Sequence, residues 1–213
     1  MRKITFRNYA AFAVAILSFT VFSSAQTSFS SADTTFGRVQ TSPSTFPNIK
    51  IANFGRMDEN YFRGAQPQPE DYAALAALGI KTIVDLRNDP TDYEKSSAEA
   101  VGIKYVNVPM SGWKSPQDAD VSRVVGILED PASGKVYVHC KAGIHRTGVT
   151  GAAYRMDKYG WDYEKAYGEM KNYNFSSGLV HGALKSYVKD YAKRPKSASA
   201  KATVAAAAVG TAQ

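Results

Sequence analysis

The chain has 213 residues, of which 44% are hydrophobic and 21% are charged, and this is the composition of an ordinary globular protein. The formal net charge is +7, a modest basic excess that favours anionic substrates; no nucleic-acid-binding motif accompanies it, so we expect no nucleic-acid partner. The single cysteine excludes a disulfide bond within the chain.

The first 25 residues have the pattern of a secretory signal peptide. Arg2 and Arg7 give a basic start, an uncharged apolar run follows from Ala10 to Phe22, and small residues precede the expected cleavage site after Ala25. This run of 13 residues is shorter than the roughly 20 that span a bilayer, so an uncleaved anchor is the weaker alternative. We therefore expect an exported protein, periplasmic or secreted, without stable membrane insertion of the mature chain.

The rest of the chain divides into three parts. Residues 26–47 are rich in Ser and Thr and predict a flexible spacer, and residues 195–213 predict a disordered tail. The 147 residues between them, 48–194, are enough for one domain with a hydrophobic core of its own. We expect this domain to act as a monomer.

Apolar runs alternate with helical patterns along this domain. The sequence predicts strands at residues 48–54, 60–64, 80–86, 103–109 and 135–139, and helices at residues 69–79, 91–102, 115–130, 147–160, 162–173 and 177–194. Strands that alternate with helices indicate an α/β fold with a central, mostly parallel sheet flanked by helices. Sites in such sheets lie at the carboxyl ends of the strands, and Cys140 ends the apolar strand expected at 135–139.

The segment HCKAGIHRTG, residues 139–148, lies between that strand and the next helix and has the composition of an anion-binding loop. Gly143 permits a tight turn, and the backbone N–H groups and dipole at the start of the helix attract a phosphate-sized anion. Arg146 can bind two phosphoryl oxygens at once, and the positive surroundings favour a nucleophilic Cys140 thiolate. The sequence thus predicts attack of sulfur on phosphorus; the alternative is a buried cysteine that serves only as a small apolar residue.

This loop resembles the signature of the cysteine-based protein tyrosine phosphatase superfamily, with five residues between Cys140 and Arg146 and with Thr147 and Gly148 after them. It is most similar to the loop of the atypical dual-specificity phosphatases of plants and fungi. The similarity extends to residues 61–87 and 106–116 and spans about residues 48–190. It implies the fold of that superfamily, no metal or other cofactor, and a phosphorylated protein, lipid or inositol phosphate as substrate.

The resemblance also implies a role for each residue of the loop. Cys140 would be the nucleophile, Arg146 would bind the phosphate, Thr147 would help sulfur leave in the second step, and His139 would orient the loop from behind through hydrogen bonds. Two of the loop residues, Lys141 and His145, are explained equally well by a role in substrate binding and by a solvated position at the rim. The backbone N–H groups that hold the phosphate oxygens would be those of Lys141, Ala142, Gly143, Ile144, His145 and Arg146.

The proton donor for the leaving group is not evident. In this superfamily an upstream loop carries an aspartate, but the corresponding stretch here, residues 106–116, has no carboxylate. Asp118 and Asp120 are the nearest candidates. The pattern predicts a helix with its N-cap at Ser115 and Pro116 at the first position, which would explain Asp118 by capping alone, and Asp120 as a solvated residue.

A site without an acid needs a leaving group that departs unaided, such as that of an aryl phosphate or a phosphoanhydride. The plant and fungal enzymes act on inositol pyrophosphates, but Ala142 and Ile144 stand where their loops usually carry basic residues, which favours a less densely charged substrate. We expect Trp113 to cover that substrate. Asp85 and Arg87 predict a charge pair at a strand end, and a place in the lining of the site is the alternative. The rival functions are a phosphate-binding module without turnover and, less compatible with the loop spacing and the single thiol, a sulfur transferase or arsenate reductase.

Overall fold

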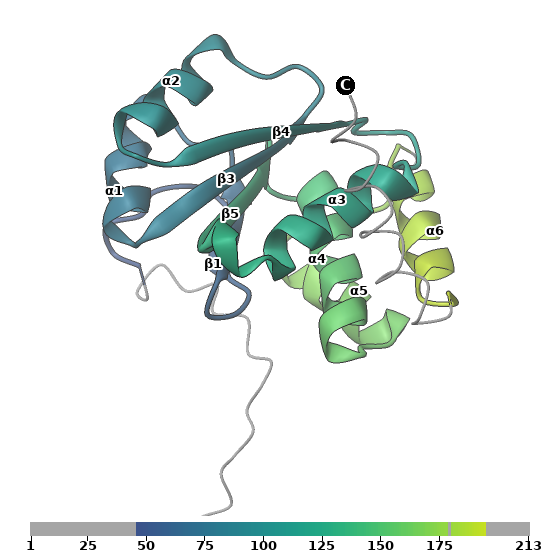
Figure 1. Cartoon of the computed structure of the whole chain (residues 1–213). Coiled ribbons are helices and arrows are strands. Elements are labelled where there is room, and N and C mark those ends of the chain that lie inside the picture. The colour runs from purple at the N-terminus through teal and green to yellow at the C-terminus, as the bar shows by residue number, and fades with distance from the viewer. Residues whose placement is uncertain (1–45, 179, 195–213) are drawn as a thin grey trace, which may run out of the picture. The chain divides into compact units, whose positions relative to one another are not determined.

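A sheet of five strands in the order β1-β2-β5-β3-β4 forms the centre of the described structure (Figure 1). Only β1 is antiparallel to its neighbour, and the other strand pairs are parallel. This arrangement confirms the predicted α/β fold and puts the strand that ends in Cys140 in the middle of the sheet. The strands are β1 (Gly55–Arg56), β2 (Tyr61–Ala65), β3 (Ile80–Arg87), β4 (Lys104–Met110) and β5 (Lys135–Cys140).

Helices cover both faces of the sheet. Figure 1 shows α1 and α2 on one side and the group from α3 to α6 on the other. Short 3-10 turns lie at Pro69–Asp71, before α1, and at Pro131–Ser133, after α3. The helices are α1 (Tyr72–Ala77), α2 (Asp92–Ala100), α3 (Asp118–Glu129), α4 (His145–Tyr159), α5 (Tyr163–Asn172) and α6 (Gly182–Tyr191).

The core has two layers because successive residues of a strand point to opposite faces. In β5, Val136, Val138 and Cys140 belong to the larger layer, which packs against α3, α4, α5 and α6. Tyr137 belongs to the smaller layer beneath α1 and α2. His139, next in the same alternation as Tyr137, stacks on it with ring centroids 5.8 Å apart. The thiol of Cys140 and the imidazole of His139 therefore lie on opposite faces of the sheet.

Several predicted element boundaries are wrong. Residues 48–54 do not form a strand: Asn53 has a φ of 52°, and one hydrogen bond, from the Ala65 N–H to the Ala52 carbonyl at 2.9 Å, ties the segment to β2. Helix α4 begins at His145, two residues before the predicted start, and α6 begins at Gly182 rather than near residue 177. The first shift matters for function, because it brings the helix amino terminus into the anion-binding loop itself.

The computed structural model describes residues 46–178 and 180–194. The predicted signal peptide, nearly all of the predicted spacer and the predicted tail lie outside these residues. None of the helices within the described ranges combines the length and the apolar character needed to cross a membrane.

Candidate active site

The predicted anion-binding loop leaves the carboxyl end of β5 and enters α4 directly. Gly143, in the middle of the loop, has a φ of 67°, a conformation that favours glycine. A Cβ at this position would lie 2.3 Å from the carbonyl carbon of Gly64, on the neighbouring strand β2. Backbone cannot yield as a side chain does, so the close approach of the loop to β2 requires glycine here.

Three side-chain and backbone donors hold the carbonyl groups of the loop from behind. The buried guanidinium of Arg63 donates to the Gly143 carbonyl at 2.7 Å, and the Asn53 amide donates to the Ala142 carbonyl at 2.8 Å. The Gln66 N–H donates to the Lys141 carbonyl at 3.3 Å. Because these carbonyls are bound on the outer side, the loop can present its N–H groups inward, as an anion-binding nest requires.

Cys140 is 3% exposed and lies at the base of this loop. Burial by itself raises the pKa of the thiol, but hydrogen bonds from Thr147 and the Ile144 N–H, together with the charge of Arg146, outweigh it, and the pKa is lowered overall. The buried Thr147 hydroxyl has no other hydrogen-bond partner among the described residues, so it is available to the sulfur. The surroundings therefore favour the thiolate, which is the nucleophilic form.

Arg146 is held above the loop by the ends of two strands. Its guanidinium donates to the Met110 carbonyl at 3.1 Å, to the Asn88 side chain at 3.2 Å and to the Leu86 carbonyl at 3.4 Å. Within the described ranges no carboxylate forms an ion pair with it. Its positive charge is therefore not neutralised and remains available to an anion in the loop.

Aromatic rings line one side of the rim. The rings of His145 and His181 are stacked with centroids 3.4 Å apart, and Trp113 lies over His181 with centroids 6.2 Å apart. Phe175 meets His145 edge-on. Burial lowers the pKa of His145, and the nearby charges of His181 and Arg146 lower it further, which favours the neutral ring. Lys141 is exposed, as predicted for a rim residue.

The loop and its supports agree with the comparison to known families. A family model described as DSP-PTPase phosphatase fused to NAD+ kinase matches residues 35–190. The chain belongs to this phosphatase family.

Relatives of this phosphatase come from bacteria, plants and fungi. The dual specificity protein phosphatase TpbA of Pseudomonas aeruginosa is 32% identical over 140 residues, which are 62% of this chain and 62% of TpbA. The inositol diphosphatase DSP4 of Arabidopsis thaliana is 29% identical over 101 residues, 45% of this chain and 51% of DSP4. The phosphatase chain thus spans less than two thirds of the length of these curated relatives.

Solved structures have the same fold. The crystal structure of P. aeruginosa TpbA matches this phosphatase with a TM-score of 0.61 at 26% identity, over 78% of this chain and 96% of that one. The catalytic core of SIW14 from S. cerevisiae, a PP-IP phosphatase, matches with a TM-score of 0.62 at 20% identity, over 76% and 95% of the two chains.

The carboxylate of Asp118, a predicted proton donor, contacts residues outside the loop. The helix begins at Asp118 with Gln117 as N-cap, so the predicted cap at Ser115 is wrong. The Asp118 carboxylate accepts hydrogen bonds from Arg194 at 2.8 Å and from Tyr187 at 3.0 Å. Asp120 is half-buried and has no hydrogen bond or ion pair with another described side chain. The catalytic role of either aspartate stays a prediction.

Asp89 is the carboxylate whose pKa responds to Arg146, but it does not suit a proton donor. A hydrogen bond from Arg87 lowers its pKa, and the charges of Arg87 and Arg146 add to this effect against the opposing contribution from burial. The ion pair between Arg87 and Asp89 measures 3.0 Å. The predicted charge pair of Arg87 with Asp85 is therefore wrong: the hydrogen bond that Asp85 accepts from Arg87 comes from the backbone N–H and not from the guanidinium, and the carboxylate is buried.

Sequence reasoning missed the supports of the loop. Arg63, Asn53 and Gln66 were not singled out, although residues 61–87 contributed to the family resemblance. Arg63 carried a usable signal, since an arginine in the apolar strand pattern YFRG is unusual for a buried strand. His139, the support that was predicted, contacts the carboxylates of Asp85 and Glu94, and its orienting role stays a prediction.

Proposed function

We propose that this chain is an exported, cysteine-dependent phosphatase that hydrolyses aryl phosphates such as phosphotyrosine through a phosphocysteine intermediate. The observation that carries the proposal is the pairing of a buried thiol of lowered pKa with an arginine that no carboxylate neutralises among the described residues. A dianionic phosphoryl group satisfies both, because its oxygens accept from Arg146 and the loop N–H groups while its phosphorus faces Cys140.

The reaction takes two steps. The Cys140 thiolate attacks phosphorus and forms an S–P bond, while the P–O bond to the aryl group breaks and its electron pair leaves with the phenolate oxygen. Water then attacks phosphorus and the S–P bond breaks, which returns the thiolate and releases inorganic phosphate. The Thr147 hydroxyl, which hydrogen-bonds to sulfur, stabilises the thiolate as it leaves. Arg146 and the loop N–H groups hold the equatorial oxygens in both steps.

The aromatic rim favours an aryl phosphate over a densely charged one. Trp113 is 65% exposed, and with His181 and His145 it gives the rim flat aromatic surfaces suited to a phenyl ring. A crystal structure of a variant of the related TpbA contains pTyr, whereas DSP4 is named an inositol diphosphatase. An inositol polyphosphate or pyrophosphate, or a phosphoinositide, is the alternative substrate class, and it would require further cations at the rim.

The site of action follows from the amino-terminal pattern. The basic start and apolar run of residues 1–25 support export to the periplasm or the exterior, where the substrate would be an extracytoplasmic phosphoprotein or a small aryl phosphate. We include a monomeric state in the proposal. Fractionation of the native host with and without a deletion of residues 2–25 tests export; recovery of the unprocessed chain in the cytoplasm would contradict it.

Release of phosphate from p-nitrophenyl phosphate by the purified chain in the presence of EDTA tests the activity. Cys140→Ser removes the nucleophile and should reduce turnover to background, and Arg146→Lys, which retains the charge but not the bidentate geometry, should reduce it strongly. Acid quenching of the wild type should trap phosphorus on Cys140. Activity that survives in Cys140→Ser, or that requires a metal ion, would overturn the proposal.

Trp113→Ala tests the substrate class. If the indole contacts the aryl ring, this variant has a higher KM for a phosphotyrosyl peptide and an unchanged inhibition constant for inorganic phosphate, which occupies the loop alone. The matched measurement with an inositol polyphosphate should show weaker binding by the wild type and no effect of the substitution. The opposite order of preference would favour the inositol phosphate class.

A phosphate-binding module without turnover is the second candidate, and the contacts of Asp118 favour it. Tyr187 of α6 and Arg194, beyond the end of that helix, bind this carboxylate, so Asp118 is not free to give a proton to the leaving group. A module of this kind would bind vanadate and phosphate with Arg146 but would form no phosphocysteine from any aryl phosphate.

A further inference from the structure

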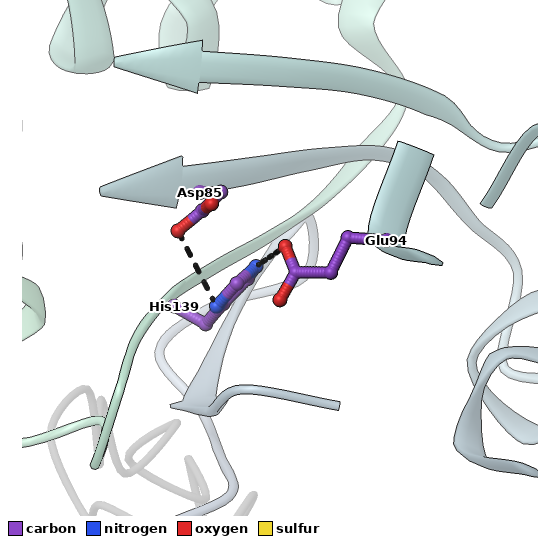
Figure 2. A group of neighbouring side chains, drawn as sticks. All are labelled: Asp85, Glu94 and His139. Carbon is purple, nitrogen blue, oxygen red and sulfur yellow. Dashed lines mark ion pairs between the residues drawn. The ribbon is translucent and has the colours of Figure 1, made fainter. Parts of the chain in front are cut away.

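Three ionisable side chains that the proposed reaction does not use meet on the face of the sheet opposite the thiol. Asp85 comes from β3, Glu94 from α2 and His139 from β5, and all three are 0% exposed. Figure 2 shows the imidazole between the two carboxylates. The Nδ1 atom of His139 is 3.8 Å from Asp85 Oδ1, and its Nε2 atom is 3.4 Å from Glu94 Oε2. Each ring nitrogen therefore faces its own carboxylate.

The two carboxylates are held differently. Asp85 accepts the Arg87 N–H at 2.8 Å and the Tyr105 hydroxyl at 2.9 Å, so it is fixed to β3 and β4. The carboxylate of Glu94 has no hydrogen bond within the described ranges, and His139 is its ionic partner. Burial of a carboxylate without a partner costs free energy of folding. Glu94, the third residue of α2, is nevertheless buried, which indicates that its contact with His139 is specific.

The positions of the three side chains limit how many protons the cluster can hold without repulsion. A neutral imidazole has one N–H and one lone pair, and the lone pair would face an anionic oxygen on one side or the other. Two protons among the three groups remove this repulsion, either as an imidazolium between two carboxylates or as a neutral ring beside one carboxylic acid. Burial raises the pKa of Asp85, and the charge of Glu94 raises it further against the opposing effect of His139, which agrees with a shared proton.

Arg87 is a cation near the cluster: burial lowers its pKa, but Asp89 and, after it, Asp85 and Glu94 raise it, and its guanidinium pairs with Asp89 at 3.0 Å. Tyr72 of α1 and Tyr105 of β4 wall the cluster with hydroxyl groups, and burial together with the charges of Glu94 and Asp85 raises the pKa of both. A metal ion is the alternative occupant, because one ligand atom from each of the three side chains lies within 4.8 Å of the other two; against it, each ring nitrogen faces a different carboxylate.

The cluster acts at the point where β5 becomes the phosphate loop. His139 and Cys140 are consecutive, and their side chains leave opposite faces of the strand end. Ionic contacts of 3.8 and 3.4 Å on the two edges of the ring restrict its position, and they restrict with it the backbone of residue 139 and the direction of the next Cα–Cβ bond. The same strand end pairs with Gly64, against which Gly143 packs.

We propose that Glu94, with Asp85, is a positioning residue that clamps His139 through shared protons and so aims the sulfur of Cys140 at the phosphorus of a bound substrate. This inference rests on the proposed phosphatase function for its kinetic readout. It assigns Glu94 to the reaction although it lies on the far side of the sheet from the loop. The clamp acts on the direction of the thiolate and leaves the phosphate-binding N–H groups and Arg146 in place.

Glu94→Gln in the full chain is the test, since it keeps the size of the side chain and one carbonyl oxygen but removes the charge. A misaligned thiolate lowers kcat for p-nitrophenyl phosphate by roughly 10- to 100-fold with KM nearly unchanged. Loss of a negative charge alone would favour the thiolate and would not lower kcat. The direction of the change in kcat therefore distinguishes a misdirected thiolate from an electrostatic effect. The matched control is Glu99→Gln on the same helix, where the carboxylate is 56% exposed and 4.0 Å from Lys95.

A double-substitution cycle with His139→Gln shows whether the two residues act through one another. If they do, the double variant is no slower than the slower single variant. Wild-type kcat in Glu94→Gln, additive losses in the cycle, or a loss of kcat that matches the unfolded fraction measured by circular dichroism would overturn the proposal. Stoichiometric zinc in the purified wild type that is lost with activity in Glu94→Gln would overturn it in favour of a metal site.

Ligand binding separates this inference from the proposed function. Vanadate bonds to the sulfur, whereas inorganic phosphate needs only the loop and Arg146. If Glu94 aims the thiolate, Glu94→Gln weakens vanadate binding by roughly 10-fold and leaves phosphate binding unchanged, whether or not the wild type turns over. An inactive wild type with this binding pattern would contradict the phosphatase proposal alone, and equal effects on both ligands would contradict the clamp.

Discussion

Arg63→Met separates the geometry of the phosphate loop from the stability of the fold. Arg63 is 0% exposed, donates to the Gly143 carbonyl at 2.7 Å and lies 3.9 Å from the centroid of the Tyr173 ring. It forms no ion pair with a described carboxylate. A methionine of similar length fills the space, and loss of a buried charge offsets the lost contacts, so the free energy of unfolding should change by less than about 1.5 kcal/mol.

The effect on anion binding should be much larger. A hydrogen bond from a charged donor contributes about 1.5–3 kcal/mol. If Arg63 holds the Gly143 peptide in place, that contribution weakens phosphate binding by roughly 10- to 150-fold. Isothermal titration with inorganic phosphate measures the affinity directly, and thermal unfolding followed by circular dichroism measures the stability of the same sample.

Arg56→Met is the matched control, because Arg56 lies on the adjacent strand β1, is exposed, and donates to the Asp58 carbonyl rather than to the loop. It should leave phosphate affinity unchanged. An unchanged affinity in Arg63→Met would refute the role of the loop support. A loss of stability above about 3 kcal/mol with a proportional loss of binding would show instead that Arg63 serves the fold as a whole.

Three further predictions concern the loop and its substrate. Gly143→Ala puts a Cβ 2.3 Å from the Gly64 carbonyl carbon at a φ of 67°. We expect this variant to lose vanadate binding in titrations while circular dichroism shows that the chain remains folded. Retained binding would contradict the close approach of the loop to β2. Because the pKa of Cys140 is lowered, its thiolate persists below the ordinary thiol pKa of about 8.5 and is lost only as pH falls through the lowered value. Iodoacetamide should therefore label Cys140 at neutral pH faster than it labels glutathione, and phosphate should protect the thiol. If neither Asp118 nor Asp120 protonates the leaving group, kcat should fall by roughly 100-fold or more from p-nitrophenyl phosphate to an alkyl phosphate; a comparable rate on both, lost in Asp118→Asn or Asp120→Asn, would identify the missing donor.

The sequence was informative where the residues of the site lie close together in the chain. Cys140, Gly143 and Arg146 stand within seven residues between a strand and a helix, so residue types and spacing were enough to predict an anion-binding loop with a nucleophile. The α/β fold followed from the alternation of elements. Both kinds of inference use local patterns only.

The supports of the loop depend on contacts between distant segments and could not be predicted in this way. Arg63 and Gly143 are 80 residues apart, and Asn53 and Ala142 are 89 apart. Asp118 shows the converse failure: its position after Ser115 and Pro116 matched a capping pattern, but its carboxylate is bound by Tyr187 of α6 and by Arg194, which follows that helix. A local pattern cannot report which distant cation will reach a helix terminus.

The sheet separates opposite charges around the thiol. Arg146 lies above the loop and Arg63 behind it, and neither forms an ion pair with a described carboxylate. The buried carboxylates next to β5, Asp85 and Glu94, lie on the other face and are engaged by His139. Because fields act strongly in a buried, low-dielectric site, a free carboxylate on the thiol side would oppose both the thiolate and the dianion. The lowered pKa of Cys140, which is 3% exposed, agrees with this arrangement: burial raises it, hydrogen bonds from Thr147, the charge of Arg146 and the Ile144 N–H lower it, and the buried carboxylates next to β5 lie behind the strand.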